Sequence, residues 1–139
     1  MSPYKRMERL IGDYIAAHYH RVVEVGIGNA PEAAQVIAAA GKRVTATDIR
    51  PSAADGIEVI RDDIFSPRDG IYRDADLVYA IRPGVEMVPP LVDLARRINA
   101  DLLVYHLGNE IFGDGGEIVD CGVTLHRYHA AQYPSKRED

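Results

Sequence analysis

RVVEVGIGNAPEAAQVIAAAGKRVTATDIRP, residues 21–51, carries the strongest structural pattern in the chain. It opens with an apolar run at 22–25, which suits a strand covered on both faces. A turn with two glycines follows, then an alanine-rich segment at 31–40 that predicts a helix, and a second run at 44–47 that ends in Asp48. This order of strand, glycine turn, helix, strand and acid predicts the first half of a Rossmann-like domain that binds a nucleotide or nucleoside.

The glycine turn between the first strand and the helix has room for a ligand. Gly26 and Gly28 lack a Cβ, so the backbone can turn sharply and a ligand can lie against it. Pro31 suits the first position of a helix, where its missing N–H would have had no partner. Of the two residues before this proline, Asn29 has the better capping side chain and is the predicted cap; as part of the turn, it is also predicted to bind the cofactor.

Asp48 is the predicted contact to the ribose of the ligand. It follows the second strand, and at the carboxyl end of such a strand one carboxylate can accept hydrogen bonds from both ribose hydroxyls. The alternative is a structural role, in which the carboxylate caps the turn at 50–51.

The spacing of the turn favours S-adenosylmethionine (SAM) over NAD. The dinucleotide fingerprint has a third glycine five residues after the first, where this chain has Pro31. The SAM pattern has an acid, two glycines and a small residue at alternate positions; Glu24, Gly26 and Gly28 match it, and Ala30 replaces the usual third glycine. The Glu24 carboxylate would repel a pyrophosphate, whereas it would attract the ammonium and sulfonium groups of SAM.

The composition is that of one globular domain. The chain has 139 residues and a net charge of −5, and no run of lysine and arginine points to nucleic acid or to a membrane surface. No apolar run approaches the roughly 20 residues of a spanning helix, and residues 1–10 lack the apolar core of a secretion signal. Cys121 is the sole cysteine, which excludes an internal disulfide and a cysteine-based zinc site. We expect a cytoplasmic protein that binds a small molecule, and a homodimer or a protein partner stays open.

The rest of the chain predicts a three-layer, Rossmann-like α/β domain with a mostly parallel sheet and helices on both faces. Apolar residues at helical spacing indicate helices at 3–19 and 85–99, although Pro89 and Pro90 make the second one start late or break. Short apolar runs indicate three further strands, at 57–60, 76–81 and 101–105. A closing antiparallel hairpin around Gly122 is indicated at 118–128.

The domain is expected over residues 1–130, with its first helix, within 1–20, packed on the sheet. The segments at 66–74 and 106–116 contain proline and glycine and predict loops. A polar tail at 131–139 is expected to fray.

Two acids after the third strand are candidates for binding the adenine. Asp62 or Asp63 could accept the adenine amino group, because loops at the carboxyl ends of parallel strands line the ligand crevice. The alternative for each is a solvated loop acid.

Arg82 and His106 are the candidate catalytic residues. Arg82 follows the fourth strand and could orient an anionic acceptor through two parallel hydrogen bonds; the alternative is an ion pair with Glu86 or Asp76. His106 follows the fifth strand and titrates in the useful range for a general base; the alternative is a packing role. The histidines have no recognised metal-binding spacing, so no metal is predicted.

The strings TATDIRPS, RDDIFSPRDGIY and DLVYAIRPGVEM resemble an uncharacterised archaeal family of short, methyltransferase-like Rossmann domains. The resemblance runs from about Val22 to Tyr128 and implies the fold, without an established reaction. More widely, the pattern is similar to that of the class I SAM-dependent methyltransferases. That similarity implies SAM as cofactor. Glu24, Gly26 and Gly28 would border its methionine part, and Asp48 would hold the ribose. Ile49 would lie against the adenine face, and Asp62 or Asp63 would bind the adenine edge.

The turn after the fourth strand departs from the methyltransferase pattern. Amino-group methyltransferases carry an Asn- or Asp-Pro-Pro-aromatic turn there, whereas this chain has Ile81-Arg82-Pro83-Gly84. The chain also lacks the inserted domain that usually grips a substrate. Three functions stay open: a small-molecule methyltransferase, a non-catalytic SAM- or nucleotide-binding scaffold or sensor, and an NAD-binding domain.

Overall fold

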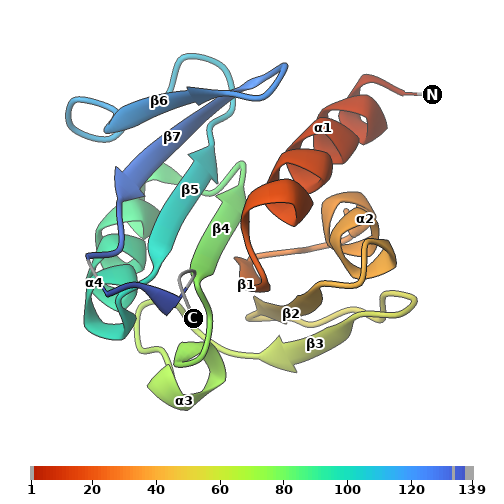
Figure 1. The fold of residues 1–139 in the computed structure, drawn as a ribbon, viewed down its shortest axis with the longest axis horizontal. Helices are drawn as coiled ribbons and strands as arrows, with labels where there is room; N and C mark the ends of the chain where they lie inside the picture. Colours follow the sequence, from red (N-terminus) through yellow and green to blue (C-terminus); the bar gives the residue numbers. More distant parts are fainter. Residues whose placement is uncertain (1, 133, 137–139) are drawn as a thin grey trace.

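The computed structural model describes residues 2–132 and 134–136, which form three layers around one sheet (Figure 1). The sheet has seven strands in the order β3-β2-β1-β4-β5-β7-β6. The first five strands of this order are parallel, whereas β7 is antiparallel to both β5 and β6. The strands are β1 (Arg21–Val25), β2 (Arg43–Asp48), β3 (Glu58–Arg61), β4 (Leu77–Ile81), β5 (Asp101–Tyr105), β6 (Glu117–Asp120) and β7 (Thr124–His129).

The helices cover both faces of the sheet. Helices α1 and α2 pack on one face, and α3 and α4 pack on the other (Figure 1). Within the described part of the chain, none of these helices is long and apolar enough to cross a membrane. The helices are α1 (Pro3–His18), α2 (Glu32–Ala39), α3 (Asp69–Tyr72), the 3-10 helix η1 (Val85–Met87) and α4 (Val88–Ile98).

Alternation along the central strands sends neighbouring side chains to opposite layers. In β1, Val23 and Val25 pack against α4, whereas Val22 packs against α1 and α2. Because side chains alternate with a period of two, Glu24 lies on the same face as Val22, beside Tyr79 of β4. The predicted fold class, with its mostly parallel sheet and closing antiparallel hairpin, is confirmed.

The predicted cap of α2 is wrong. The helix begins at Glu32, one residue later than expected, and Pro31 occupies the cap position without a side-chain hydrogen bond. Asn29 therefore lies in the preceding turn rather than at the helix end. A side chain from another helix takes over the capping, because the backbone N–H of Ala33 donates to Oε1 of Glu8 at 3.1 Å.

One further segment differs from expectation. Helix α3 lies in the segment predicted as a loop, where the buried Tyr72 fixes it to the sheet by donating a hydrogen bond to Asp62. The described part of the tail forms hydrogen bonds to the domain: Ala131 N donates to Asp101 Oδ1 at 2.7 Å. Further along, the Lys136 ammonium donates to three backbone carbonyls, at 2.5–2.9 Å, those of Arg73, Ala75 and Ile98.

Gly12 is the point where α1 meets α2, and replacing it by alanine is expected to destabilise the protein. An added Cβ would lie 2.8 Å from the carbonyl oxygen of Ala33 and 2.9 Å from Cβ of Val36. Overpacking of this kind costs about 1–3 kcal/mol, which outweighs the gain of about 1 kcal/mol in helix propensity. Urea denaturation should show a lower midpoint for Gly12→Ala, while Asp13→Ala, on the exposed side of the same turn, should leave it nearly unchanged.

Candidate functional site

The turn after β1 and the acid after β2 are joined by a hydrogen bond. The backbone N–H of Gly28 donates to Oδ2 of Asp48 at 2.8 Å, and that of Gly26 donates to the carbonyl of Thr47 at 2.8 Å. Both glycines have positive φ, 76° and 55°, a conformation that side chains with a Cβ rarely adopt. Oδ1 of Asp48 accepts from Arg50 N at 2.9 Å, the turn-capping role considered above. Each carboxylate oxygen has a second lone pair, so this role leaves acceptor capacity for a ligand.

A cavity of about 280 Å³ adjoins this turn at the carboxyl ends of β1, β2 and β3. Large apolar side chains form part of its lining. Two of these, Ile49 and Phe65, are each 60% exposed at the rim. Exposed apolar side chains beside a cavity indicate a surface that a ligand can cover. The lining residues are Val25, Gly26, Thr47, Asp48, Ile49, Asp62, Asp63, Ile64, Phe65 and Met87.

Asp62 and Asp63 both line the cavity, but their carboxylates accept different numbers of hydrogen bonds within the protein. Asp62 is buried and accepts from the Tyr72 hydroxyl at 2.6 Å and from Arg68 Nε at 3.1 Å. Asp63 accepts one hydrogen bond, from Phe65 N at 2.9 Å, through Oδ1. Asp63 therefore has the carboxylate with more acceptor capacity left for a ligand.

Glu24 lies two residues before Gly26, the first glycine of the turn, and is buried. Its Oε1 accepts a hydrogen bond from the Tyr79 hydroxyl at 2.8 Å. Burial raises the pKa of Glu24 to about 8, since the charged form has lost its water. The hydrogen bond from Tyr79 lowers the pKa and the nearby Glu8 carboxylate raises it, both by less than burial does. The free protein thus holds a largely protonated carboxyl group at this position near neutral pH.

The amino end of α2, where a nucleotide phosphate commonly binds, is occupied by Glu8. One carboxylate oxygen of Glu8 accepts from Ala33 N, and the other lies 3.7 Å from a guanidinium nitrogen of Arg82. Burial also raises the pKa of Glu8, while the hydrogen bond from Ala33 and the Arg82 charge lower it. An acid at a helix amino end excludes a phosphate by charge and by volume.

Arg82 is held inside the molecule rather than left free at the strand end. It pairs with Glu8, and neither acid expected as its partner, Glu86 or Asp76, forms that ion pair in the described residues. Its guanidinium carbon lies 4.4 Å from the ring centroid of Tyr4, a cation–π contact. Its φ of 56° is in the left-handed region, which is uncommon for a residue with a side chain.

His106 takes part in a chain of hydrogen bonds with Tyr128 and Phe112. Phe112 N donates to the Tyr128 hydroxyl oxygen at 2.9 Å, and the hydroxyl lies 2.6 Å from Nε2 of His106. Which of these two groups donates depends on the tautomer of the ring. Burial lowers the pKa of His106, with a smaller lowering from His126, so the neutral form dominates near pH 7.

Nδ1 of His106 is buried and has no hydrogen-bond partner among the described residues. His106 lines a second cavity, of about 550 Å³, between the end of β5 and the β6–β7 hairpin. The general-base role predicted for His106 stays a prediction.

The sequence pattern missed Glu8, Tyr79 and Met87, which shape the site. Glu8 lies in the buried stripe of α1, four residues before Gly12, and a charged residue on a buried helix face is a usable signal. Tyr79 and Met87 gave no such signal, since each reads as an ordinary core residue. Among the residues that the structure describes, no group of three or more His, Cys, Asp or Glu side chains could hold a metal ion.

The fold is similar to solved methyltransferases at low sequence identity. A SAM-dependent methyltransferase from Archaeoglobus fulgidus matches with a TM-score of 0.59 and 13% identity, over 80% of this chain and 56% of that one. The 1,6-didemethyltoxoflavin-N1-methyltransferase of Burkholderia thailandensis, solved with S-adenosylhomocysteine, matches with a TM-score of 0.53 and 12% identity, over 92% of this chain and 62% of that one. The chain spans a little more than half the length of these methyltransferases, and the likeness establishes a shared fold.

Relatives at higher identity are archaeal and share one family name. A UPF0146 protein of Pyrococcus horikoshii is 32% identical over 126 residues, which cover 85% of this chain and 96% of the relative. One from Archaeoglobus fulgidus is 38% identical over 106 residues, 75% of this chain and 78% of the relative. The model of the uncharacterised protein family UPF0146 matches residues 7–133, and the chain belongs to that family.

Proposed function

We propose that this protein binds SAM, with the adenosine in the 280 Å³ cavity and the methionine end above Glu24. The observation that carries the proposal is the cavity itself. It lies at the carboxyl ends of the first three strands, and Asp48 stands in its wall with acceptor capacity left for a ribose diol. The same edge of the sheet holds the ligand in open α/β folds generally.

The adenine would lie between apolar side chains at the rim. Ile49 and Phe65 are exposed there, and Met87 closes the cavity from the other side, with its Cε 3.9 Å from where a Cβ on Gly26 would be. A planar base would cover these side chains and remove them from water. Asp63, whose carboxylate keeps an unused oxygen, would accept the adenine amino group.

The methionine end would meet two buried acids. Glu24 is buried two residues before Gly26, and Glu8 occupies the amino end of α2. The ammonium and sulfonium of SAM would favour the ionised form of these acids, whereas the pyrophosphate of NAD would face the Glu8 carboxylate. A volume of 280 Å³ also suits a nucleoside better than a dinucleotide, because cavities for drug-sized ligands begin near 300 Å³. SAM is therefore favoured over NAD.

Methyl transfer to a small acceptor is the second candidate function. The 550 Å³ cavity beside His106 favours it, since β5 is the neighbour of β4, which in turn adjoins β1 and the glycine turn. His106, in the lining of this cavity, would orient the acceptor. Arg82 is paired with Glu8, so it reaches an anionic acceptor only if that pair opens. A scaffold or sensor role would use the SAM cavity alone.

SAM binding is expected to stabilise the protein and to release a proton near pH 7. The ligand ammonium would favour the ionised form of Glu24, which is largely protonated in the free protein. Calorimetry in buffers of different ionisation enthalpy measures the released proton, and SAM at 100 times its dissociation constant should add about 2.7 kcal/mol of stability.

Three comparisons make this measurement specific. Adenosine, which lacks the ammonium, should bind without releasing a proton, and Glu24→Gln should bind SAM without releasing one. NAD should stabilise the protein less than SAM and S-adenosylhomocysteine do. A response to NAD with none to SAM would overturn the proposal.

A further inference from the structure

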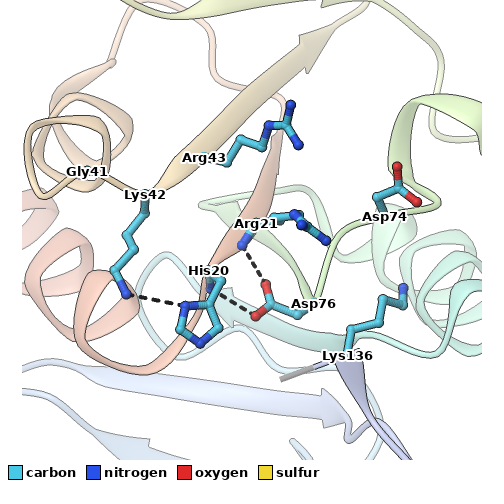
Figure 2. A pocket seen from close by; sticks show the side chains of 8 residues that line it. All are labelled: His20, Arg21, Gly41, Lys42, Arg43, Asp74, Asp76 and Lys136. Carbon is cyan, nitrogen blue, oxygen red and sulfur yellow. Dashed lines mark hydrogen bonds between the residues drawn. The ribbon is translucent and has the colours of Figure 1, made fainter. Parts of the chain in front are cut away.

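A third cavity, of about 460 Å³, lies at the amino ends of β1 and β2, whereas Asp48 lies at the carboxyl end of β2. Figure 2 shows the residues that line this cavity. It is formed where β1 and β2 begin and by the turn that leads into β4, and it shares no lining residue with the 280 Å³ cavity. Four cationic side chains and two carboxylates line it, together with His20 and Gly41. They are Arg21, Lys42, Arg43, Lys136, Asp74 and Asp76.

Arg21 and Arg43 are direct neighbours across two parallel strands. They are register partners in the β1–β2 pair, so their side chains leave the same face of the sheet. Adjacent strands are about 4.8 Å apart, and like charges at such a spacing destabilise a sheet. Lys42 is a third cation of this cavity; its side chain extends toward His20, and its Nζ lies 3.5 Å from Nδ1 of His20 (Figure 2).

No ion pair offsets these three cations within the described part of the chain. Arg97, in contrast, forms an ion pair with Asp69 at 2.9 Å. Arg127 forms ion pairs with Asp101 at 3.3 Å and with Glu117 at 2.7 Å. In Figure 2 the guanidinium groups of Arg21 and Arg43 extend toward the space that has Asp74 on its far side.

The other charged groups of the cavity either form hydrogen bonds with the backbone or lie across the cavity from the arginines. The Asp76 carboxylate accepts from the backbone N–H groups of His20 and Arg21, both at 2.9 Å, so it serves the backbone (Figure 2). The Lys136 ammonium is held by its three carbonyls and forms a fixed wall. Asp74 is exposed across the cavity from the arginines.

We propose that this cavity binds a small, multiply charged phosphate ligand, of the di- or triphosphate class, through Arg21, Lys42 and Arg43. Guanidinium groups bind phosphate oxygens in parallel pairs, and an anion between the two arginines would remove their repulsion. The volume is that of a small-molecule site. A chain with a net charge of −5 and a carboxylate on the far wall disfavours a long polyanion such as RNA.

Isothermal titration with pyrophosphate and tripolyphosphate, each at 50 and 150 mM salt, tests the proposal. Both should bind, tripolyphosphate more tightly, and the double variant Arg21→Gln/Arg43→Gln should weaken tripolyphosphate at least tenfold. The matched control removes the same charge from exposed positions on α1, Arg6→Gln/Arg9→Gln, and should bind like the wild type. Circular dichroism melting confirms that each variant is folded.

Three results would overturn the proposal: absence of binding to the wild type, equal loss in the control variant, or tighter binding of a short single-stranded RNA than of tripolyphosphate. The outcome is separate from that of the SAM proposal, because the two cavities share no residues. Tripolyphosphate should add its stabilisation in the presence or absence of SAM, and it should do so in Asp48→Ala as well.

Discussion

Replacing Asp48 by alanine is expected to weaken SAM about 100-fold and to remove the thermal stabilisation by SAM at concentrations that saturate the wild type. The carboxylate would accept both ribose hydroxyls, and hydrogen bonds to a charged acceptor contribute about 1.5–3 kcal/mol each. Loss of about 2.7 kcal/mol corresponds to a 100-fold change in the dissociation constant. Isothermal titration with SAM and with S-adenosylhomocysteine measures it, and both ligands should be affected alike because they share the ribose.

The control variant for Asp48→Ala must remove a comparable turn-capping carboxylate that does not line the cavity. Asp120 provides one, since its Oδ1 accepts from Gly122 N at 2.9 Å in the β6–β7 hairpin, just as Asp48 accepts from Arg50 N. Asp120→Ala should bind SAM with wild-type affinity. If Asp48→Ala kept full affinity, the carboxylate would have only its turn-capping role, and the adenosine would have to bind elsewhere.

The ligand-free protein is expected to lose about 2 kcal/mol of stability between pH 6.5 and pH 8, and Glu24→Gln should abolish most of this loss. Burial raises the pKa of Glu24 to about 8, above its unfolded value of 4.5. Between these values the folded state binds a proton that the unfolded state does not, so stability falls as pH rises, by about 1.4 kcal/mol per unit well below pH 8 and by about half of that at pH 8. Glutamine cannot ionise and can still accept the hydrogen bond from Tyr79.

Urea denaturation at pH 6.5, 7, 7.5 and 8 measures this effect. The window starts at pH 6.5 because burial lowers the pKa of His106, and that group acts in the opposite sense at lower pH. Glu58→Gln, on the exposed surface of β3, should keep the wild-type slope. Equal slopes for the wild type and Glu24→Gln would mean that Glu24 is ionised in the folded protein.

The fold was predictable because its signals are local. The apolar run at 22–25, the two glycines and Asp48 define a strand, a turn and a strand end without reference to the rest of the chain. The hairpin around Gly122 was predictable for the same reason. Helix α3 was not, because its four residues are fixed by the contact of Tyr72 with Asp62, which no local pattern reports.

The site was predictable only in part, since its acids work through distant partners. The sequence places Glu24 beside the turn but gives no sign that burial keeps it protonated. It also gives no sign that Glu8 caps α2 in place of Asn29, because that contact joins two helices. For Asp62 and Asp63, the choice between them depends on Tyr72 and Arg68, which are brought close by folding.

The pairing of Glu8 with α2 and Arg82 makes the first turns of the chain a part of the ligand region. Tyr4 stacks on the guanidinium of Arg82, and Glu8 reaches the strand-end turn in which Arg82 stands, so α1 braces that turn from outside the sheet. A purification tag fused ahead of Pro3, or proteolytic trimming of this helix, would therefore disturb the neighbourhood of β4 rather than a remote surface. Expression designs that leave the opposite terminus for the tag would spare it.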